Sequence, residues 1–124
     1  MKFYLCKLCG NIAELVTERG GTLVCCGQDM HHLVPNTEEA AVEKHLPFVT
    51  KTETGINVKV GSVPHPMMDA HYIDFIYVRT TKGGQRVSLD VDGSAEADFS
   101  FTADNQPIEA YEYCNLHGLW KVEL

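Results

Sequence analysis

The sequence predicts a mainly β protein, in which a small metal-stapled N-terminal unit precedes an antiparallel β-sandwich of immunoglobulin-like size. Two observations lead to this prediction. Four cysteines lie close together near the N-terminus, as Cys6-x-x-Cys9 and the adjacent pair Cys25-Cys26. From Pro47 onward, apolar and polar residues alternate with the period of half-buried strands. A chain of 124 residues has room for one domain with a small appendage.

The N-terminal unit is expected to span residues 1–36. So short a segment can hardly bury enough apolar surface to fold without a staple. Its glycines indicate short strands and tight turns around the cysteines. Pro35-Asn36 marks the boundary with the second unit, residues 37–124. Just after this boundary we expect a brief helical turn over Thr37–Val42, capped by Asn36 or Thr37.

Seven short strands are expected in the second unit, with turn signals such as Lys82-Gly83-Gly84 and Asp104-Asn105 between them. This number of strands in a segment of this length is typical of an immunoglobulin-like sandwich. The expected strands are Phe48–Thr52, Asn57–Val60, Tyr72–Val78, one through Val87, Leu89 and Val91, one through Ala97, Phe99 and Phe101, Ile108–Tyr113 and Leu119–Leu124.

The charge distribution excludes some classes of function. The formal net charge is −7, and all of it falls in residues 37–124, because residues 1–36 contain three basic and three acidic residues. With no basic stripe, the chain is not expected to bind nucleic acid. No stretch approaches the roughly 20 apolar residues of a membrane span. The chain start has no signal-peptide hydrophobic region, so we expect a cytoplasmic protein with reduced thiols.

The four N-terminal cysteines provide a complete tetrathiolate set. Cys6-x-x-Cys9 is a turn that directs two thiolates to one point, and Cys25-Cys26 supplies two more after a loop. Tetrahedral coordination by four sulfurs suits zinc or iron, and the spacing alone favours neither. Adjacent cysteines are unusual for a zinc ribbon, and two neighbouring sulfurs on one ion should distort the tetrahedron. The site either takes part in redox chemistry or only holds the small unit together.

A second, different metal site is indicated by the fifth cysteine, Cys114, which has His117 three residues later. His45, His65 and His71 lie in loop regions, and the prolines that flank His65 stiffen its loop. The ends of sandwich strands could bring these five side chains together. Taken singly, each histidine is more often a solvated or core residue, and a lone buried cysteine is usually a small hydrophobe.

The chemistry of such a second site would be that of a redox centre. Four imidazoles and one axial thiolate around iron leave the opposite position open, and the thiolate pushes electron density toward it. An open, electron-rich ferrous centre is suited to donating one electron to an oxygen species. Zinc is redox-silent and would gain nothing from this ligand set.

These motifs together resemble the desulfoferrodoxin family, the two-iron class of superoxide reductase. They occur in the family's order and span nearly the whole chain. The segments that carry the resemblance are Cys6-Lys7-Leu8-Cys9-Gly10-Asn11, Cys25-Cys26-Gly27, Glu43-Lys44-His45-Leu46-Pro47, Gly61-Ser62-Val63-Pro64-His65-Pro66-Met67, His71-Tyr72-Ile73 and Cys114-Asn115-Leu116-His117-Gly118-Leu119-Trp120.

The resemblance implies two iron ions per chain. A desulforedoxin-like domain, residues 1–36, would bind a distorted tetrahedral tetrathiolate iron through Cys6, Cys9, Cys25 and Cys26. An immunoglobulin-like catalytic domain, residues 37–124, would bind a square-pyramidal iron through four histidines and one cysteine. The resemblance further implies a cytoplasmic homodimer that reduces superoxide to hydrogen peroxide with electrons from a rubredoxin-like donor. In the family pattern the equatorial ligands of the second iron would be His45, His65, His71 and His117, and Cys114 would be axial.

Two charged residues beside His45 are candidates for catalytic roles. Lys44 could attract an anionic substrate into an otherwise acidic surface and stabilise developing peroxide charge. Glu43 could occupy the sixth position of the ferric resting state, as the resemblance implies. The ordinary alternative for both is an exposed, solvated side chain. Rival functions for the whole chain are a zinc-binding interaction module, a superoxide dismutase and a ferrous oxygenase, which normally uses two histidines and a carboxylate.

Overall fold

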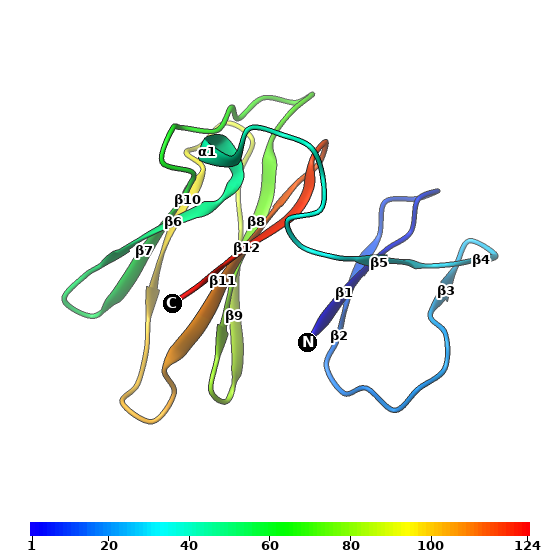
Figure 1. Cartoon of the computed structure of the whole chain (residues 1–124), viewed down its shortest axis with the longest axis horizontal. Helices are drawn as coiled ribbons and strands as arrows, with labels where there is room; N and C mark the ends of the chain where they lie inside the picture. The colour runs from blue at the N-terminus through cyan, green and yellow to red at the C-terminus, as the bar shows by residue number, and fades with distance from the viewer. The chain divides into compact units, whose positions relative to one another are not determined.

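The computed structural model describes the whole chain, residues 1–124, and divides it into two compact units, Met1–Val34 and Pro35–Leu124 (Figure 1). Both units are built from antiparallel strands, and the chain has a single short helix. The prediction of a mainly β fold, with a small metal-stapled unit before a sandwich, is therefore confirmed. None of the helical structure is long or apolar enough for a bilayer crossing.

The first unit consists of a three-stranded sheet and a very short hairpin. The sheet has the order β2-β1-β5, with β1 spanning Lys2–Leu5, β2 Ile12–Leu15 and β5 His31–Leu33. The hairpin pairs β3, Val24–Cys25, with β4, Gln28–Asp29. Side chains that are fully enclosed are few here, namely Phe3, Cys6 and Leu33. So thin a core agrees with the expectation that this unit needs a staple.

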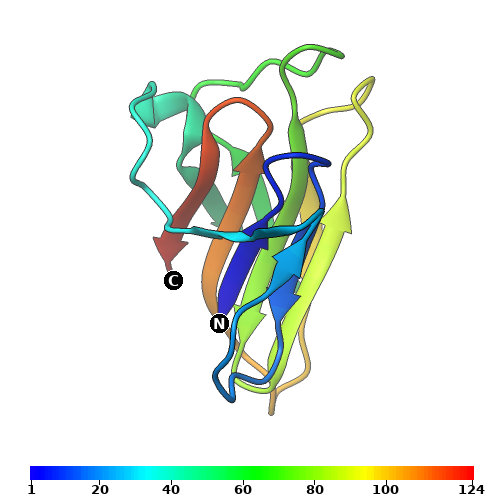
Figure 2. The same cartoon turned by 90° about the vertical axis from the view of Figure 1, so that its right-hand side faces the viewer.

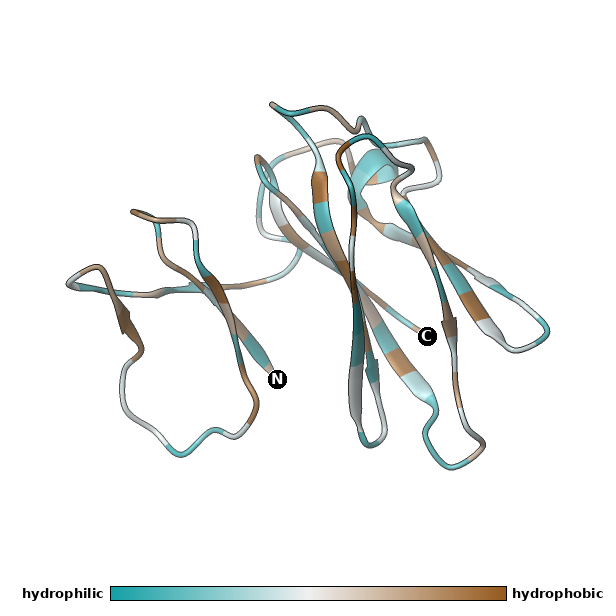
Figure 3. Ribbon diagram, turned by 180° about the vertical axis from the view of Figure 1, so that it is seen from behind, coloured by the Kyte–Doolittle hydropathy of each residue, from teal (hydrophilic) through white to brown (hydrophobic).

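The second unit is a sandwich of two antiparallel sheets. The three-stranded sheet has the order β10-β7-β6 and the four-stranded sheet the order β12-β11-β8-β9. Apolar residues alternate with polar ones along several strands, as the brown and teal bands on the ribbons show (Figure 3). The strands are β6 Pro47–Lys51, β7 Gly55–Val60, β8 Ile73–Thr80, β9 Gly83–Ser88, β10 Glu96–Ser100, β11 Pro107–Cys114 and β12 Gly118–Glu123.

The core of the sandwich lies between its two sheets and extends to one end of it. Its buried members come from strands of both sheets. The last of them along the chain is Cys114, which has no exposed surface and closes β11 opposite Gly118. Figure 2 shows that the turn between β11 and β12 lies at the same end of the sandwich as α1. The buried core residues are Ile56, Val58, Val60, Ile73, Ile76, Val78, Phe99, Ala110 and Cys114.

Seven strands form the second unit, as expected, but one of them is shifted toward the N-terminus. The strand expected through Val87, Leu89 and Val91 begins at Gly83 and ends at Ser88. Beyond it, the chain turns, because the Gly93 amide donates to the Asp90 carbonyl at 3.0 Å. The alternation of side chains therefore continues past the point at which the strand pairing stops.

The expected helical turn over Thr37–Val42 is wrong. The helix α1 instead spans Val42–His45 and has no side-chain cap. The reason is that the Asn36 side chain is engaged elsewhere. Its Nδ2 donates to the Lys121 carbonyl at 3.0 Å, and its Oδ1 accepts from the Lys121 amide at 2.8 Å. Asn36 therefore extends the edge of the four-stranded sheet and is not free to cap a helix.

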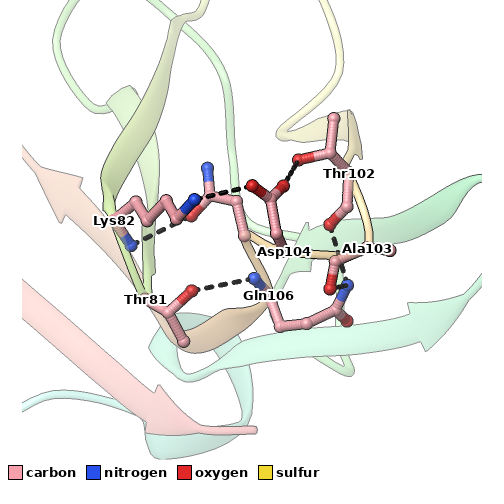
Figure 4. A network of polar contacts seen from close by, with 7 residues as sticks. Thr81, Lys82, Thr102, Ala103, Asp104 and Gln106 are labelled. Atoms are coloured by element: carbon pink, nitrogen blue, oxygen red, sulfur yellow. Dashed lines mark hydrogen bonds and ion pairs between the residues drawn. The ribbon is translucent and has the colours of Figure 1, made fainter.

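The opposite end of the sandwich is closed by a polar network between the β8–β9 turn and the β10–β11 loop (Figure 4). Lys82 Nζ pairs with Asp104 at 2.6 Å, and Thr102 Oγ1 donates to the same carboxylate at 2.8 Å. The Gln106 amide donates to Thr81 Oγ1 at 3.1 Å. These contacts tie the two loops together, so this end of the sandwich is cross-linked and polar.

Candidate metal centres

The first unit brings its four cysteines together at the tips of two turns. The Sγ atoms of Cys6, Cys9, Cys25 and Cys26 all lie within 4.8 Å of one another. Two of the separations, Cys9 to Cys25 at 3.6 Å and Cys25 to Cys26 at 4.0 Å, are close to the ~3.8 Å edge of a tetrahedron whose sulfurs are about 2.3 Å from one ion. The donor set therefore fits a single tetrahedral metal ion.

Backbone conformation explains how two adjacent cysteines can face the same point. Cys26 has a φ of 54°, in the left-handed region, and Gly27 follows with a φ of 75°. This turn reverses the chain directly at the cysteine pair, so the two side chains converge. In the first turn, a hydrogen bond from the backbone amide of Cys9, supported by that of Leu8, is the main reason that the pKa of Cys6 falls to about 6. A thiolate is thus favoured at Cys6, whereas hydrogen bonds with the neighbouring cysteines raise the pKa of Cys25 and Cys26.

The second unit gathers its candidate ligands at one end of the sandwich. His45 ends α1, His65 and His71 lie in the loop between β7 and β8, and Cys114 and His117 flank the turn between β11 and β12. Donor atoms of His45, His65, His71 and Cys114 lie within 4.8 Å of one another. His117 joins them, because its Nδ1 is 3.1 Å from His45 Nε2 and 3.8 Å from Cys114 Sγ.

The four imidazole rings stand at the corners of a square. The ring centroids of neighbouring corners are 4.8 Å apart for His45–His65, 4.5 Å for His65–His71, 5.1 Å for His71–His117 and 4.8 Å for His117–His45. The diagonal from His45 to His71 is longer, at 6.4 Å. Neighbouring rings are inclined by 73–85°, so each presents an edge to the next. Cys114 Sγ lies 3.5 Å from His65 Nε2 and supplies a fifth donor.

Backbone carbonyls fix the orientation of two of these rings. His45 Nδ1 donates to the Ala41 carbonyl at 2.7 Å, and His65 Nδ1 donates to the Pro66 carbonyl at 2.7 Å. In each ring the proton is thereby held on Nδ1, and Nε2 is left with a lone pair directed at the cluster. Such outer hydrogen bonds are typical of histidines that bind metals.

Burial favours the neutral form of three histidines of this cluster, His45, His65 and His71. It is the largest cause of the lowered pKa of His45 and His71, and it lowers the pKa of His65 to about 4. The positive charge of Lys44 makes a smaller contribution to the lowered pKa of both His45 and His71. Neutral imidazoles can bind a metal ion at neutral pH without first losing a proton.

An unpartnered nitrogen and a buried sulfur indicate that the cluster suits a cation. His71 Nε2 is buried and has no hydrogen-bond partner. Burial raises the pKa of Cys114, while the amides of Leu116 and His117 act in the opposite direction. An unpartnered imidazole nitrogen is costly in a buried site unless a metal ion takes up its lone pair, and the buried Cys114 sulfur beside it is a further donor for such an ion. The residues present therefore fit a five-donor metal site.

Two residues that sequence reasoning did not single out hold the ligands in place. Asn115 Oδ1 accepts from the Tyr72 amide at 2.9 Å, and its Nδ2 donates to the Ala70 carbonyl at 3.1 Å, so its side chain bonds the residues on both sides of His71. Trp120 stacks on the His45 ring with centroids 5.2 Å apart and donates from Nε1 to the His117 carbonyl at 3.0 Å. Their position beside Cys114 and His117 in the sequence was the available signal.

The helix α1, which carries Glu43, Lys44 and His45, packs closely against the backbone of Gly61. A Cβ atom on Gly61 would lie 2.5 Å from the Glu43 carbonyl oxygen and 2.9 Å from the Leu46 carbonyl oxygen. The Glu43 carbonyl also accepts from the Val63 amide at 3.0 Å. The side chains of Glu43 and Lys44 themselves are exposed. The close backbone approach at Gly61 therefore sets the position of α1 over the cluster.

The fold and the two donor sets define a β protein with two dissimilar metal sites, one of four thiolates and one of several imidazoles with a thiolate. Family models agree with this class: the model described as Desulfoferrodoxin matches residues 37–123, and the model described as Desulfoferrodoxin, N-terminal domain, matches residues 1–33. The chain belongs to the desulfoferrodoxin family. This family is of the two-iron type, and the chain has its four-cysteine and its histidine–cysteine iron sites.

Individual relatives match over most of the chain. A desulfoferrodoxin of Syntrophotalea carbinolica is 46% identical over 123 residues, which cover 99% of this chain and 96% of the relative. The crystal structure of the superoxide reductase from Treponema pallidum superposes with a TM-score of 0.83 at 39% identity and 98% coverage of both chains. A superoxide reductase (neelaredoxin) from Archaeoglobus fulgidus, with a TM-score of 0.54 and 28% identity, covers 66% of this chain and 87% of its own.

Proposed function

We propose that this chain is a superoxide reductase, which converts superoxide to hydrogen peroxide at the cluster of His45, His65, His71, Cys114 and His117. The observation that carries the proposal is the square of four imidazoles with a buried cysteine as fifth donor. Family membership and the likeness to superoxide reductase structures support it. Residues 1–36 would form the desulforedoxin-like domain and residues 37–124 the catalytic domain.

The reaction needs one electron and two protons for each superoxide ion. Ferrous iron held by the five donors would supply the electron, and the Cys114 thiolate would favour its transfer. The chain's own contribution is to hold these donors in place before the substrate arrives. His45 and His65 are fixed by backbone carbonyls, and Asn115 fixes the segment around His71. Little reorganisation is then needed during the electron transfer.

The proposed function is tested by metal analysis together with superoxide kinetics. We expect two irons per chain, a tetrathiolate spectrum and a redox-dependent thiolate band. Pulse radiolysis should show that the reduced protein consumes superoxide and forms peroxide without oxygen. Formation of oxygen without an external reductant would instead identify a dismutase, and a colourless protein with one zinc would identify an interaction module.

Lys44 is proposed to steer superoxide to the centre. It is exposed on α1, and its charge reaches His45 and His71, whereas the second unit as a whole is acidic. In Lys44→Ala we expect the second-order rate with superoxide to fall about tenfold at low salt, with a weaker salt dependence. Lys51→Ala, which removes an exposed lysine at the end of β6, is the matched control. Equal rates and salt slopes in wild type and Lys44→Ala would contradict the steering role.

Glu43 is proposed to reach the sixth position of the oxidised resting state and to assist the release of peroxide. Its backbone is anchored by the Val63 amide, while its side chain is exposed. In Glu43→Ala we expect the ferric absorption spectrum to shift, because a carboxylate ligand would be replaced by water or left absent. The spectrum of the oxidised variant is the measurement. An unaltered ferric spectrum would remove the case for carboxylate ligation.

The partners of the chain also belong to this proposal. A rubredoxin-like protein is proposed as the electron donor. The tetrathiolate iron is proposed as an accessory redox or structural centre, bound by Cys6, Cys9, Cys25 and Cys26. The working form is proposed to be a cytoplasmic homodimer. The family membership supports these assignments. Analytical ultracentrifugation tests the dimer: a sedimentation coefficient of a 13.8 kDa monomer at micromolar concentration would contradict it.

A further inference from the structure

Met68 is an exposed methionine that stands directly beside a ligand of the second site. Its amide donates to the His71 carbonyl and its carbonyl accepts from the His71 amide, each at 3.0 Å, so the two residues form an isolated antiparallel pair. In such a pair the two side chains project from the same face, with Cβ atoms about 5 Å apart. The Met68 thioether therefore lies on the same side as the His71 imidazole, which is one corner of the square.

The two methionines of the second unit, Met67 and Met68, differ in their surroundings. The Met67 sulfur accepts a hydrogen bond from the Ile73 amide at 3.3 Å, and its partly buried side chain packs against the core. Met68, in contrast, is 56% exposed. A small molecule that arrives from solvent at the partly exposed His71 therefore meets the Met68 sulfur, whereas the Met67 sulfur is held on the core side.

The proposed reaction brings an oxidant to this sulfur. Superoxide reduction yields hydrogen peroxide at the cluster, and a thioether is a reductant for peroxide. The sulfur gives an electron pair to one peroxide oxygen, the O–O bond breaks, and the other oxygen leaves as water with both protons. The thioether is thereby oxidised to a sulfoxide and the peroxide is reduced. Methionine sulfoxide reductases return the sulfoxide to the thioether.

Proximity decides which sulfur reacts. Free peroxide oxidises methionines according to their exposure. Peroxide that is activated by a redox metal in the cluster reacts instead with groups within reach of that metal. Besides Met68, these groups are the ligands themselves, among them His71 and the fully buried Cys114. Higher oxidation of a cysteine is irreversible, whereas oxidation of Met68 costs the site no ligand.

We propose that Met68 is a sacrificial oxidation site, whose thioether consumes peroxide activated at the cluster and thereby protects His71 and Cys114. This inference rests on the proposed redox metal of the second site, and it adds a second reaction, an oxygen transfer to the chain itself. The Met68 side chain has no part in superoxide reduction. Met68→Leu, which nearly conserves volume, should therefore reduce superoxide at the wild-type rate. A lowered rate would place Met68 in the superoxide reaction and overturn its sacrificial role.

A thioether at the far end of the sandwich provides the matched comparison. Leu124 is 48% exposed and follows β12, roughly 20 Å along the chain from Gly118 at the cluster end of that strand. The Leu124→Met variant is loaded with iron or with redox-silent zinc and treated with hydrogen peroxide, and mass spectrometry of its peptides gives the sulfoxide yields. With iron, we expect Met68 to be oxidised at least about tenfold faster than the sulfur at position 124. With zinc, the two rates should agree within about twofold, because exposure alone governs them. Equal rates with iron, or the same preference with zinc, would overturn the proposal.

The protective effect is tested by moving the thioether. Met68→Leu/Leu124→Met keeps the number of methionines and changes only their position. At a given dose of peroxide, we expect this double variant and Met68→Leu to lose more of the thiolate band than wild type and to gain more oxygen on the Cys114 peptide. A double variant as resistant as wild type would show that position is irrelevant and overturn the proposal. These peroxide assays use no superoxide, so a wild-type protein that fails to consume superoxide would overturn the proposed function separately.

Discussion

Replacement of Cys114 by serine is expected to lower the rate of superoxide reduction by more than about 100-fold. Loss of an outer-shell partner of a metal ligand typically costs about 10- to 100-fold, and here the thiolate itself is lost. Cys114 Sγ lies 3.5 Å from His65 Nε2 and 3.8 Å from His117 Nδ1. A serine oxygen donates electron density less readily than a thiolate, so the thiolate charge-transfer band should vanish. Visible absorption of the oxidised protein is the direct measurement.

Cys9→Ser is the matched control for this loss of sulfur. It also removes one thiolate from a metal site, but an exposed one from the tetrathiolate of the first unit. We expect its tetrathiolate absorption to change while the thiolate band of the second site persists. If Cys114→Ser kept that band and its superoxide rate, Cys114 would not be the axial ligand.

A single methyl group at Gly61 is expected to disrupt the catalytic site without touching a ligand. In Gly61→Ala the new Cβ would lie 2.5 Å from the Glu43 carbonyl oxygen, so α1 has to move. Overpacking of this kind typically costs about 1–3 kcal/mol. Because α1 carries His45, we also expect iron to be lost from the second site. Urea unfolding followed by the fluorescence of Trp120, the only tryptophan, measures the stability of this unit.

Gly93→Ala is the control for the glycine substitution. Its Cβ would meet its nearest atom, the Asp90 carbonyl oxygen, at 3.4 Å, which is an ordinary contact. We expect its stability and iron content to stay close to those of wild type. Iron retention in Gly61→Ala equal to that in Gly93→Ala would show that α1 does not depend on this close approach.

Residue types and their alternation made much of this fold predictable from the sequence. The strands of the sandwich follow from period-two patterning, which reflects burial of one face. The position of the helix could not be predicted in this way. The Asn36 side chain, which could have capped a helix, is hydrogen-bonded to the backbone of Lys121, a residue far along the chain. A local pattern cannot show such a competing contact.

The candidate site was predictable only in part, for the same physical reason. Cysteine and histidine have few roles in loops, so the ligand candidates could be read from composition and spacing. The square arrangement of the rings and the carbonyls that orient His45 and His65 depend on how the loops meet in three dimensions. Asn115 and Trp120 stand beside ligands in the sequence, but their contacts with Ala70, Tyr72 and His45 join distant parts of the chain and could not be predicted from that position. The close approach of Gly61 to α1 likewise joins segments that are far apart in the sequence.

Because the core of the first unit is thin, its folded structure is expected to depend on its bound metal. With only Phe3, Cys6 and Leu33 enclosed, this unit has little apolar burial to offset the entropy of an ordered chain. One of the three is itself a metal ligand, so loss of the metal also weakens the core. The sandwich has a large core of its own. Removal of the first metal by a chelator or an oxidant should therefore release Met1–Val34 as a flexible, protease-sensitive segment, while the remainder of the chain stays folded.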